Sequence, residues 1–126
     1  MKLLLDTHAF IWACVEPLRL GARATGLLTD RDNTVLVSAA SAYEIEFKRH
    51  RDPTLARLPL GLDVAVKAMD FTWLPISAAH AIAAGRLPRL HGDPFDRMLV
   101  AQSQGEDAAL VTLDSRIPDY GCAIIW

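Results

Sequence analysis

Short apolar runs that end sharply recur along the chain, and longer amphipathic segments separate them. Such runs are typical of strands buried on both faces of a sheet. The run that contains Pro75 is expected at a sheet edge, because proline donates no hydrogen bond to a ladder. The predicted strands are residues 2–5, 34–37, 71–76, 109–112 and 123–126.

The segments between these strands carry the signals of helices. Thr7, Ser77 and Asp93 are suited to begin helices as N-caps, and Gly85 and Gly105 are suited to end them. Strands that alternate with helices need crossover connections, which predict an α/β fold with a mainly parallel sheet of about five strands, covered on both faces. We expect one domain over residues 1–126. The predicted helices are residues 7–15, 22–28, 38–50, 62–69, 78–84 and 94–104.

Composition and charge narrow the possible classes of protein. Of 126 residues, 52% are hydrophobic and 22% are charged, which suffices for a packed core and excludes a disordered chain. Thirteen Lys and Arg against fifteen Asp and Glu leave a net charge of −2, so charge alone does not drive tight nonspecific binding to nucleic acid.

Without a signal peptide or an apolar run of about 18 residues, we expect a cytoplasmic protein with no membrane contact. Cys14 and Cys122 fit neither a disulfide scaffold nor a zinc site.

Acidic residues follow the predicted strands or begin the predicted helices. Asp6 and Asp114 come directly after strands, whereas Glu44, Asp93 and Asp96 lie in the first turns of helices. In a parallel sheet these positions meet at the edge formed by the carboxyl ends of the strands. Crowded carboxylates raise one another's pKa, and a divalent cation offsets that cost. Oxygen ligands favour Mg²⁺ or Mn²⁺, so the pattern predicts such a site.

Each acid also has a purely structural interpretation. Ser41 and Glu44 have the spacing of a capping box, and Asp93 with Asp96 suits the first turn of a helix. The two acids that follow strands are suited to begin turns. The sequence alone leaves both interpretations open.

Four segments resemble the motifs of PIN-domain nucleases, in the order expected for that family. They are Leu4-Leu5-Asp6-Thr7-His8, residues 37–45, residues 91–102 and Leu110-Val111-Thr112-Leu113-Asp114. The third, His91-Gly92-Asp93-Pro94-Phe95-Asp96-Arg97, closely resembles the VapC-like toxins of bacterial toxin–antitoxin pairs. This resemblance covers essentially the whole chain. It implies a PIN-like three-layer α/β/α sandwich and a metal-dependent endoribonuclease that hydrolyses RNA phosphodiester bonds with Mg²⁺ or Mn²⁺.

The resemblance also implies residue roles. Asp93 either joins the site or only caps the helix that carries Asp96, and nearby hydroxyls either support the acids or cap turns. The implied catalytic and metal-binding residues are Asp6, Glu44, Asp96 and Asp114. The hydroxyl-bearing candidates are Thr7, Thr112 and Ser115. The candidates for RNA contact are Arg86, Arg89, Arg97, Arg116 and His91.

Partners follow from the same resemblance. It implies a homodimer and a cognate antitoxin that docks in a groove with walls near residues 7–28 and 38–69. The basic run over residues 48–51 is expected at the end of a helix, away from the acids, because cations there complement the helix dipole.

Two other classes of function compete with this interpretation. A PIN-fold protein that binds RNA or regulates without cutting it would also carry these four acids. A receiver-type phosphoacceptor domain needs an acidic pair after its first strand and a lysine after a late strand, but Asp6 is followed by Thr7 and His8 and no such lysine is present. No glycine-rich turn of a nucleotide-binding fold follows Leu5.

Overall fold

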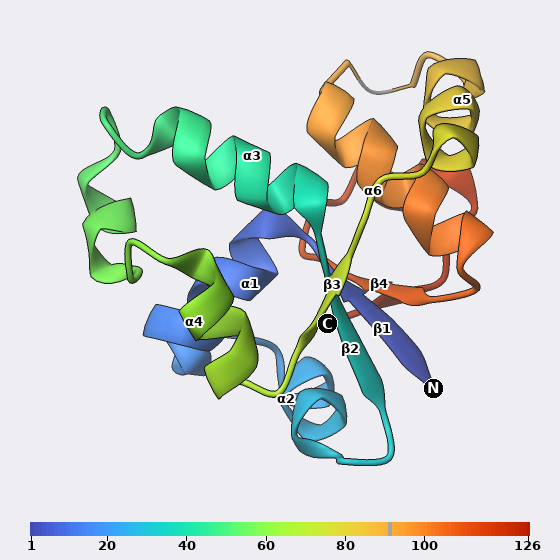
Figure 1. Cartoon of the computed structure of the whole chain (residues 1–126). Helices are drawn as coiled ribbons and strands as arrows, with labels where there is room; N and C mark the ends of the chain where they lie inside the picture. Colours follow the sequence, from blue (N-terminus) through green and yellow to red (C-terminus); the bar gives the residue numbers. More distant parts are fainter. Residues whose placement is uncertain (91) are drawn as a thin grey trace.

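A five-stranded parallel sheet organises the chain, with the strand order β3-β2-β1-β4-β5 (Figure 1). The computed structural model describes residues 1–90 and 92–126. Each neighbouring pair of strands in that range is parallel, which confirms the predicted sheet and places β3, the strand next to Pro75, at an edge. The strands are β1 (Lys2–Leu5), β2 (Thr34–Ser38), β3 (Thr72–Leu74), β4 (Ala109–Val111) and β5 (Ile124–Ile125).

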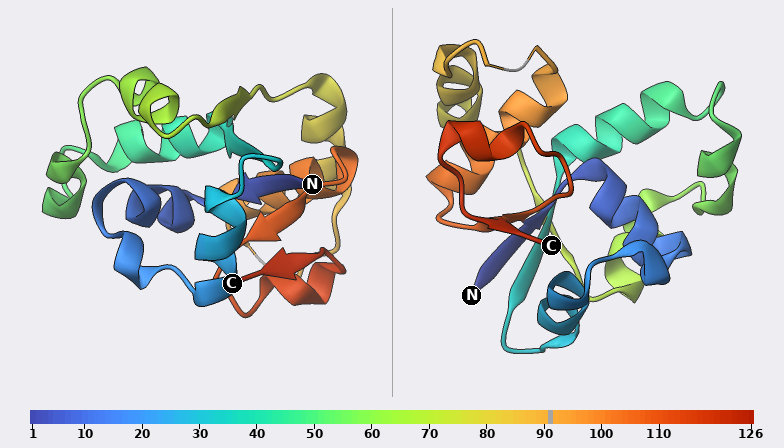
Figure 2. Two further views of the ribbon diagram at one scale, coloured as in Figure 1. Left: turned by 90° about the horizontal axis from the view of Figure 1, so that it is seen from below. Right: turned by 180° about the vertical axis from the view of Figure 1, so that it is seen from behind.

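Helices cover both faces of this sheet, so the fold is the predicted three-layer sandwich (Figures 1 and 2). Side chains alternate along β1: Leu3 and Leu5 join the core shared with α1, α2 and α4, whereas Leu4 joins the core shared with α6. All three leucines are fully buried. The α-helices are α1 (Thr7–Val15), α2 (Ala22–Thr29), α3 (Ala39–Lys48), α4 (Leu62–Ala68), α5 (Ala78–Arg86) and α6 (Pro94–Gly105).

Three short 3₁₀ helices were not predicted. They are η1 (Pro17–Arg19), η2 (Pro53–Arg57) and η3 (Ile117–Tyr120). Each has a proline in its first turn, where the missing N–H costs nothing. A proline marks a local turn but does not by itself distinguish a 3₁₀ helix from a simple break between longer elements, so the sequence pattern did not predict these turns.

Several predicted caps and ends of helices are wrong. Asp6, not Thr7, caps α1, because its Oδ1 accepts a hydrogen bond from the Ala9 N–H at 2.7 Å. Ser38 caps α3, so Ser41 lies inside the helix and forms no capping box with Glu44. Helix α5 continues through Gly85 to Arg86, α6 includes Gly105, and α3 ends at Lys48 rather than at residue 50. The predicted caps Ser77 and Asp93 are confirmed.

None of the helices within residues 1–90 and 92–126 is long and apolar enough to cross a membrane.

Candidate active site

A cleft of about 280 Å³ opens at the carboxyl edge of the sheet, where the acidic segments meet. Its walls come from the end of β1, the first turn of α1, the middle of α3, the start of α6 and the segment after β4. The lining residues are Asp6, Thr7, His8, Trp12, Glu44, Lys48, Asp93, Asp96, Leu113, Asp114 and Arg116. Five acids from four separate segments therefore line one cleft.

Asp6 is the most deeply placed of the acids that follow strands. It is 7% exposed and is held by two hydrogen bonds, from the Ala9 N–H at 2.7 Å and from Thr112 Oγ1 at 2.6 Å. Burial raises its pKa, the two hydrogen bonds lower it, and the negative charge of Asp114 raises it further. The net direction is upward, so the fold holds this carboxylate in a site that disfavours its charge.

Glu44 projects from α3 into the same cleft and is buried. Its Oε1 accepts a hydrogen bond from Thr7 Oγ1 at 2.6 Å, and its Oε2 accepts one from Lys48 Nζ at 2.7 Å. Thr7 also contacts Ser41 Oγ at 3.0 Å. The expectation that the basic run lies away from the acids is wrong for Lys48, because the i,i+4 spacing brings its ammonium back to Glu44.

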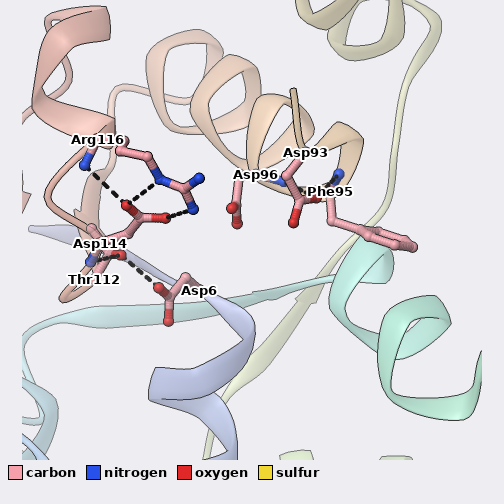
Figure 3. A network of polar contacts seen from close by, with 7 residues as sticks. All are labelled: Asp6, Asp93, Phe95, Asp96, Thr112, Asp114 and Arg116. Atoms are coloured by element: carbon pink, nitrogen blue, oxygen red, sulfur yellow. Dashed lines mark hydrogen bonds and ion pairs between the residues drawn. The ribbon is translucent and has the colours of Figure 1, made fainter. Parts of the chain in front are cut away.

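Asp114 is joined to Asp6 through one hydroxyl (Figure 3). Thr112 Oγ1 donates to Asp6 and accepts from the Asp114 N–H at 3.0 Å. Arg116 holds the Asp114 carboxylate with Nε on Oδ1 at 3.2 Å and Nη2 on Oδ2 at 3.0 Å. These bonds raise the pKa of the Arg116 guanidinium, which remains charged beside the acids.

The start of α6 supplies the remaining carboxylates. Asp93 Oδ1 accepts hydrogen bonds from the Phe95 N–H at 2.8 Å and the Asp96 N–H at 3.4 Å, so Asp93 is the N-cap. Both aspartates also line the cleft. In the view of Figure 3, Asp96 lies between Asp93 and Asp114. Asp93 therefore combines the two alternatives left open by the sequence: it caps α6 and it faces the cleft.

Arg97 points its guanidinium to the end of α5. Nη1 donates to the Pro88 carbonyl at 2.9 Å, and Nη2 donates to the carbonyls of Ala84 and Leu87, each at 2.9 Å. These bonds tie the segment after α5 to α6. The RNA contact predicted for Arg97 has to compete with all of them.

The other predicted supporting residues divide into two groups. Thr7, Thr112 and Arg116 contact the acids directly. Ser115, Arg86 and Arg89 are exposed and are not part of the cleft lining. His91 lies outside the described residues.

Sequence reasoning missed His8, Trp12 and Lys48 as parts of the cleft. His8 is exposed and lies against the Trp12 ring, with centroids 5.6 Å apart. For Lys48 a signal was available, since it stands four residues after Glu44 on one helix.

The donor set suits a divalent cation. Every candidate ligand is a carboxylate oxygen, which is the ligand type that Mg²⁺ and Mn²⁺ prefer. A cation would also offset the cost of the charge on Asp6. In the part of the chain that the structure describes, no three acidic, histidine or cysteine side chains are grouped closely enough to hold one ion. Glu44 and Asp114 are instead drawn to Lys48 and Arg116.

Comparison with known sequences gives two matches over nearly the full length. A family model described as the PIN domain matches residues 3–121. The chain is also 28% identical to ribonuclease VapC22 of Mycobacterium tuberculosis (strain ATCC 25618 / H37Rv) over 118 residues, which span 93% of this chain and 90% of that relative.

Solved structures with the same fold include VapBC and FitAcB structures. VapBC2 from Rickettsia felis, bound to a DNA fragment from its promoter, matches with a TM-score of 0.74 at 17% identity, covering 99% of this chain and 98% of that one. DNA-bound VapBC from Salmonella typhimurium matches at 0.70 with 17% identity and coverage of 99% and 97%. FitAcB from Neisseria gonorrhoeae matches at 0.67 with 18% identity and coverage of 98% and 96%. At these identities the likeness shows the fold.

Proposed function

This chain belongs to the PIN domain family, and we propose that it is a metal-dependent endoribonuclease, the toxin of a toxin–antitoxin pair. One observation carries the proposal: carboxylates from four separate segments line a single cleft, and two cations lie among them. An acidic cleft of this kind repels RNA unless a cation is bound. The similarity to a relative named as a ribonuclease supports the same activity.

Asp6, Glu44, Asp96 and Asp114 would hold Mg²⁺ or Mn²⁺. When bound, such an ion lowers the pKa of a coordinated water toward neutrality and compensates the charge of the scissile phosphate. The chain itself fixes the acids. Thr112 orients Asp6, Thr7 orients Glu44, and the Asp93 cap sets the first turn of α6 that carries Asp96.

Lys48 and Arg116 have a double role in this proposal. Each now compensates one carboxylate, Glu44 or Asp114, at the mouth of the cleft. Both side chains are long, and their stems let the charged ends move by a few ångströms. Once a bound metal ion compensates the negative charge of the acids, Lys48 and Arg116 are free to contact RNA phosphates on either side of the cut.

Cleavage of a mixed RNA pool by the purified protein tests the proposal. We expect cutting with Mg²⁺ or Mn²⁺, no cutting with a chelator, and a loss of at least about a hundredfold in Asp6→Asn and Asp96→Asn. Asp32→Asn is the matched control, because Asp32 is exposed before β2, at the opposite edge of the sheet. Circular dichroism checks that each variant is folded.

The outcomes separate the proposal from its alternative. Cutting that survives both the chelator and the two variants overturns the metal-dependent mechanism. A folded protein that binds RNA and metal but cuts no RNA in the pool favours a PIN-fold binding or regulatory protein.

The proposal includes two protein partners, an antitoxin and a second copy of the chain. Its support is the fold shared with the VapBC and FitAcB structures and a groove of about 420 Å³. That groove lies between α1, α2 and the turn from α4 to β3, which matches the expected walls in part. Sedimentation of the chain alone and with its cognate antitoxin tests both partners. A chain that stays monomeric and unbound contradicts them.

A further inference from the structure

Three aromatic rings form a continuous surface beside the acidic cleft. Tyr43 is 63% exposed and Phe47 is 53% exposed. Their rings stack, with centroids 6.0 Å apart and an interplanar angle of 13°. Phe95 extends the surface, with its centroid 5.8 Å from that of Tyr43 and its plane tilted by 35°. Rings that remain this exposed add little to the core, so folding alone does not account for them.

The two elements that carry these rings also carry the acids. Tyr43 precedes Glu44 on α3, and Phe95 precedes Asp96 on α6. Along α3, Tyr43 and Phe47 form one stripe at i,i+4 spacing, and Glu44 and Lys48 form the adjacent stripe. Figure 3 shows the Phe95 side chain directed away from the acids and toward α3. The aromatic surface therefore begins where the cleft ends.

Positive charge borders the aromatic surface. The guanidinium carbon of Arg51 lies 5.5 Å from the centre of the Phe47 ring, and Lys48, one residue after Phe47, lines the neighbouring cleft. Flat rings bordered by cations complement a ligand with flat bases and phosphates. A second copy packed on this face would bring the same two cations, whereas RNA brings negative charge.

We propose that Tyr43, Phe47 and Phe95 are a stacking platform for an unpaired base of the RNA substrate. The inference rests on the proposed ribonuclease function. It adds that the protein recognises an unpaired base next to the bond that is cut. Stacking accepts the face of any base, so the platform selects unpaired RNA over duplex and adds little preference among the four bases.

Steady-state cleavage of a single-stranded RNA, with Mg²⁺ or Mn²⁺ present, tests the platform. We expect Tyr43→Ala and Phe47→Ala each to raise KM about tenfold, with a smaller change in kcat, because stacking on one aromatic ring is worth that much to binding. Tyr43→Phe keeps the ring and should retain the wild-type KM. Ile82→Ala is the matched control, since Ile82 is 53% exposed on α5.

An RNA with an abasic nucleotide beside the cut distinguishes stacking from other contacts. For the wild-type protein, the abasic RNA should raise KM as much as Tyr43→Ala does. Combining the abasic RNA with Tyr43→Ala should add nothing further, because the same contact is removed twice. If the abasic RNA and Tyr43→Ala instead raise KM independently, so that their effects multiply, the inference is overturned.

Three more outcomes are decisive. An unchanged KM in the alanine variants, together with a loss of dimer in sedimentation, assigns this face to a second copy and overturns the inference. Absence of any metal-dependent cutting by the wild-type protein defeats the proposed function itself, and with it the inference. If cutting is lost in Asp6→Asn but is unchanged in Tyr43→Ala and Phe47→Ala, the inference is overturned and the proposed function stands.

Discussion

Asp6 lies where the surrounding protein favours the neutral form of its side chain. Burial is the largest cause of its raised pKa, and Asp114 contributes in the same direction. Residues at functional sites are often held in this way, at a cost in stability that the function requires. The Thr112 hydroxyl and the Ala9 N–H fix the carboxylate in position but do not remove that cost.

We expect Asp6→Asn to stabilise the folded protein at neutral pH. In the unfolded chain the carboxyl ionises near its ordinary pKa of 3.8, whereas the folded protein holds the proton to higher pH. The wild-type protein therefore loses stability relative to Asp6→Asn as the pH rises through 3.8 and on through the raised folded pKa. Urea unfolding at about pH 3 and about pH 7 measures the difference.

Asp32→Asn controls for the loss of one negative charge. That side chain is exposed, so its substitution should change the free energy of unfolding little at either pH. An Asp6→Asn variant that is less stable than the wild type at neutral pH would show that the two hydrogen bonds outweigh burial.

At the scale of elements, Arg97 joins α5 to α6 near the start of the acidic helix. Its guanidinium donates to the carbonyls of Ala84, Gly85, Leu87 and Pro88, at the end of α5 and just after it. Carbonyls at the end of a helix have few backbone partners, so an outside donor stabilises the helix end.

Arg97→Met should destabilise the fold by about 2 kcal/mol, because several hydrogen bonds from a charged donor are lost, two of them to part-buried carbonyl groups. The midpoint of urea unfolding measures the effect. KM for RNA should stay near the wild-type value at a temperature where the variant is folded. Unchanged stability with a raised KM would instead support the RNA contact that the sequence predicted.

The sequence was sufficient to predict the strands and the α-helices, but not the 3₁₀ helices or the contacts of side chains. Short apolar runs and Pro75 predicted the strands and one sheet edge, because those signals are local. The choice of Ser38 over Ser41 as the cap of α3 depends on where β2 ends, which the pattern left open by a few residues.

The same division holds for the candidate site. The acids meet at the edge formed by the carboxyl ends of the strands because the sheet is parallel, so their common cleft was predictable. The partners of Arg97 were not, since carbonyls at residues 84–88 come opposite its side chain only through helix packing. The i,i+4 spacing of Glu44 and Lys48 indicates that the two side chains lie close together. The basic residues around Lys48 favoured the other interpretation, a helix end away from the acids.

The whole molecule combines two well-filled core layers with a charged cleft at the edge of the sheet. The buried leucines of β1 serve both layers, and Asp6 continues directly from that strand into the cleft. A cation bound in the cleft would therefore stabilise the end of β1, the strand that contributes to both cores. Binding to the folded state alone raises stability by mass action.

Mg²⁺ or Mn²⁺ at about a hundred times its dissociation constant should raise the free energy of unfolding by about 2.7 kcal/mol. For a chain of this length, each kcal/mol corresponds to a rise in Tm of roughly 4 °C, which calorimetry resolves. Asp6→Asn and Asp96→Asn should lose most of this rise because each removes a proposed ligand, whereas Asp32→Asn should retain it. A rise of equal size in Asp96→Asn would place the ion away from α6, and the proposed ligand set would then be wrong.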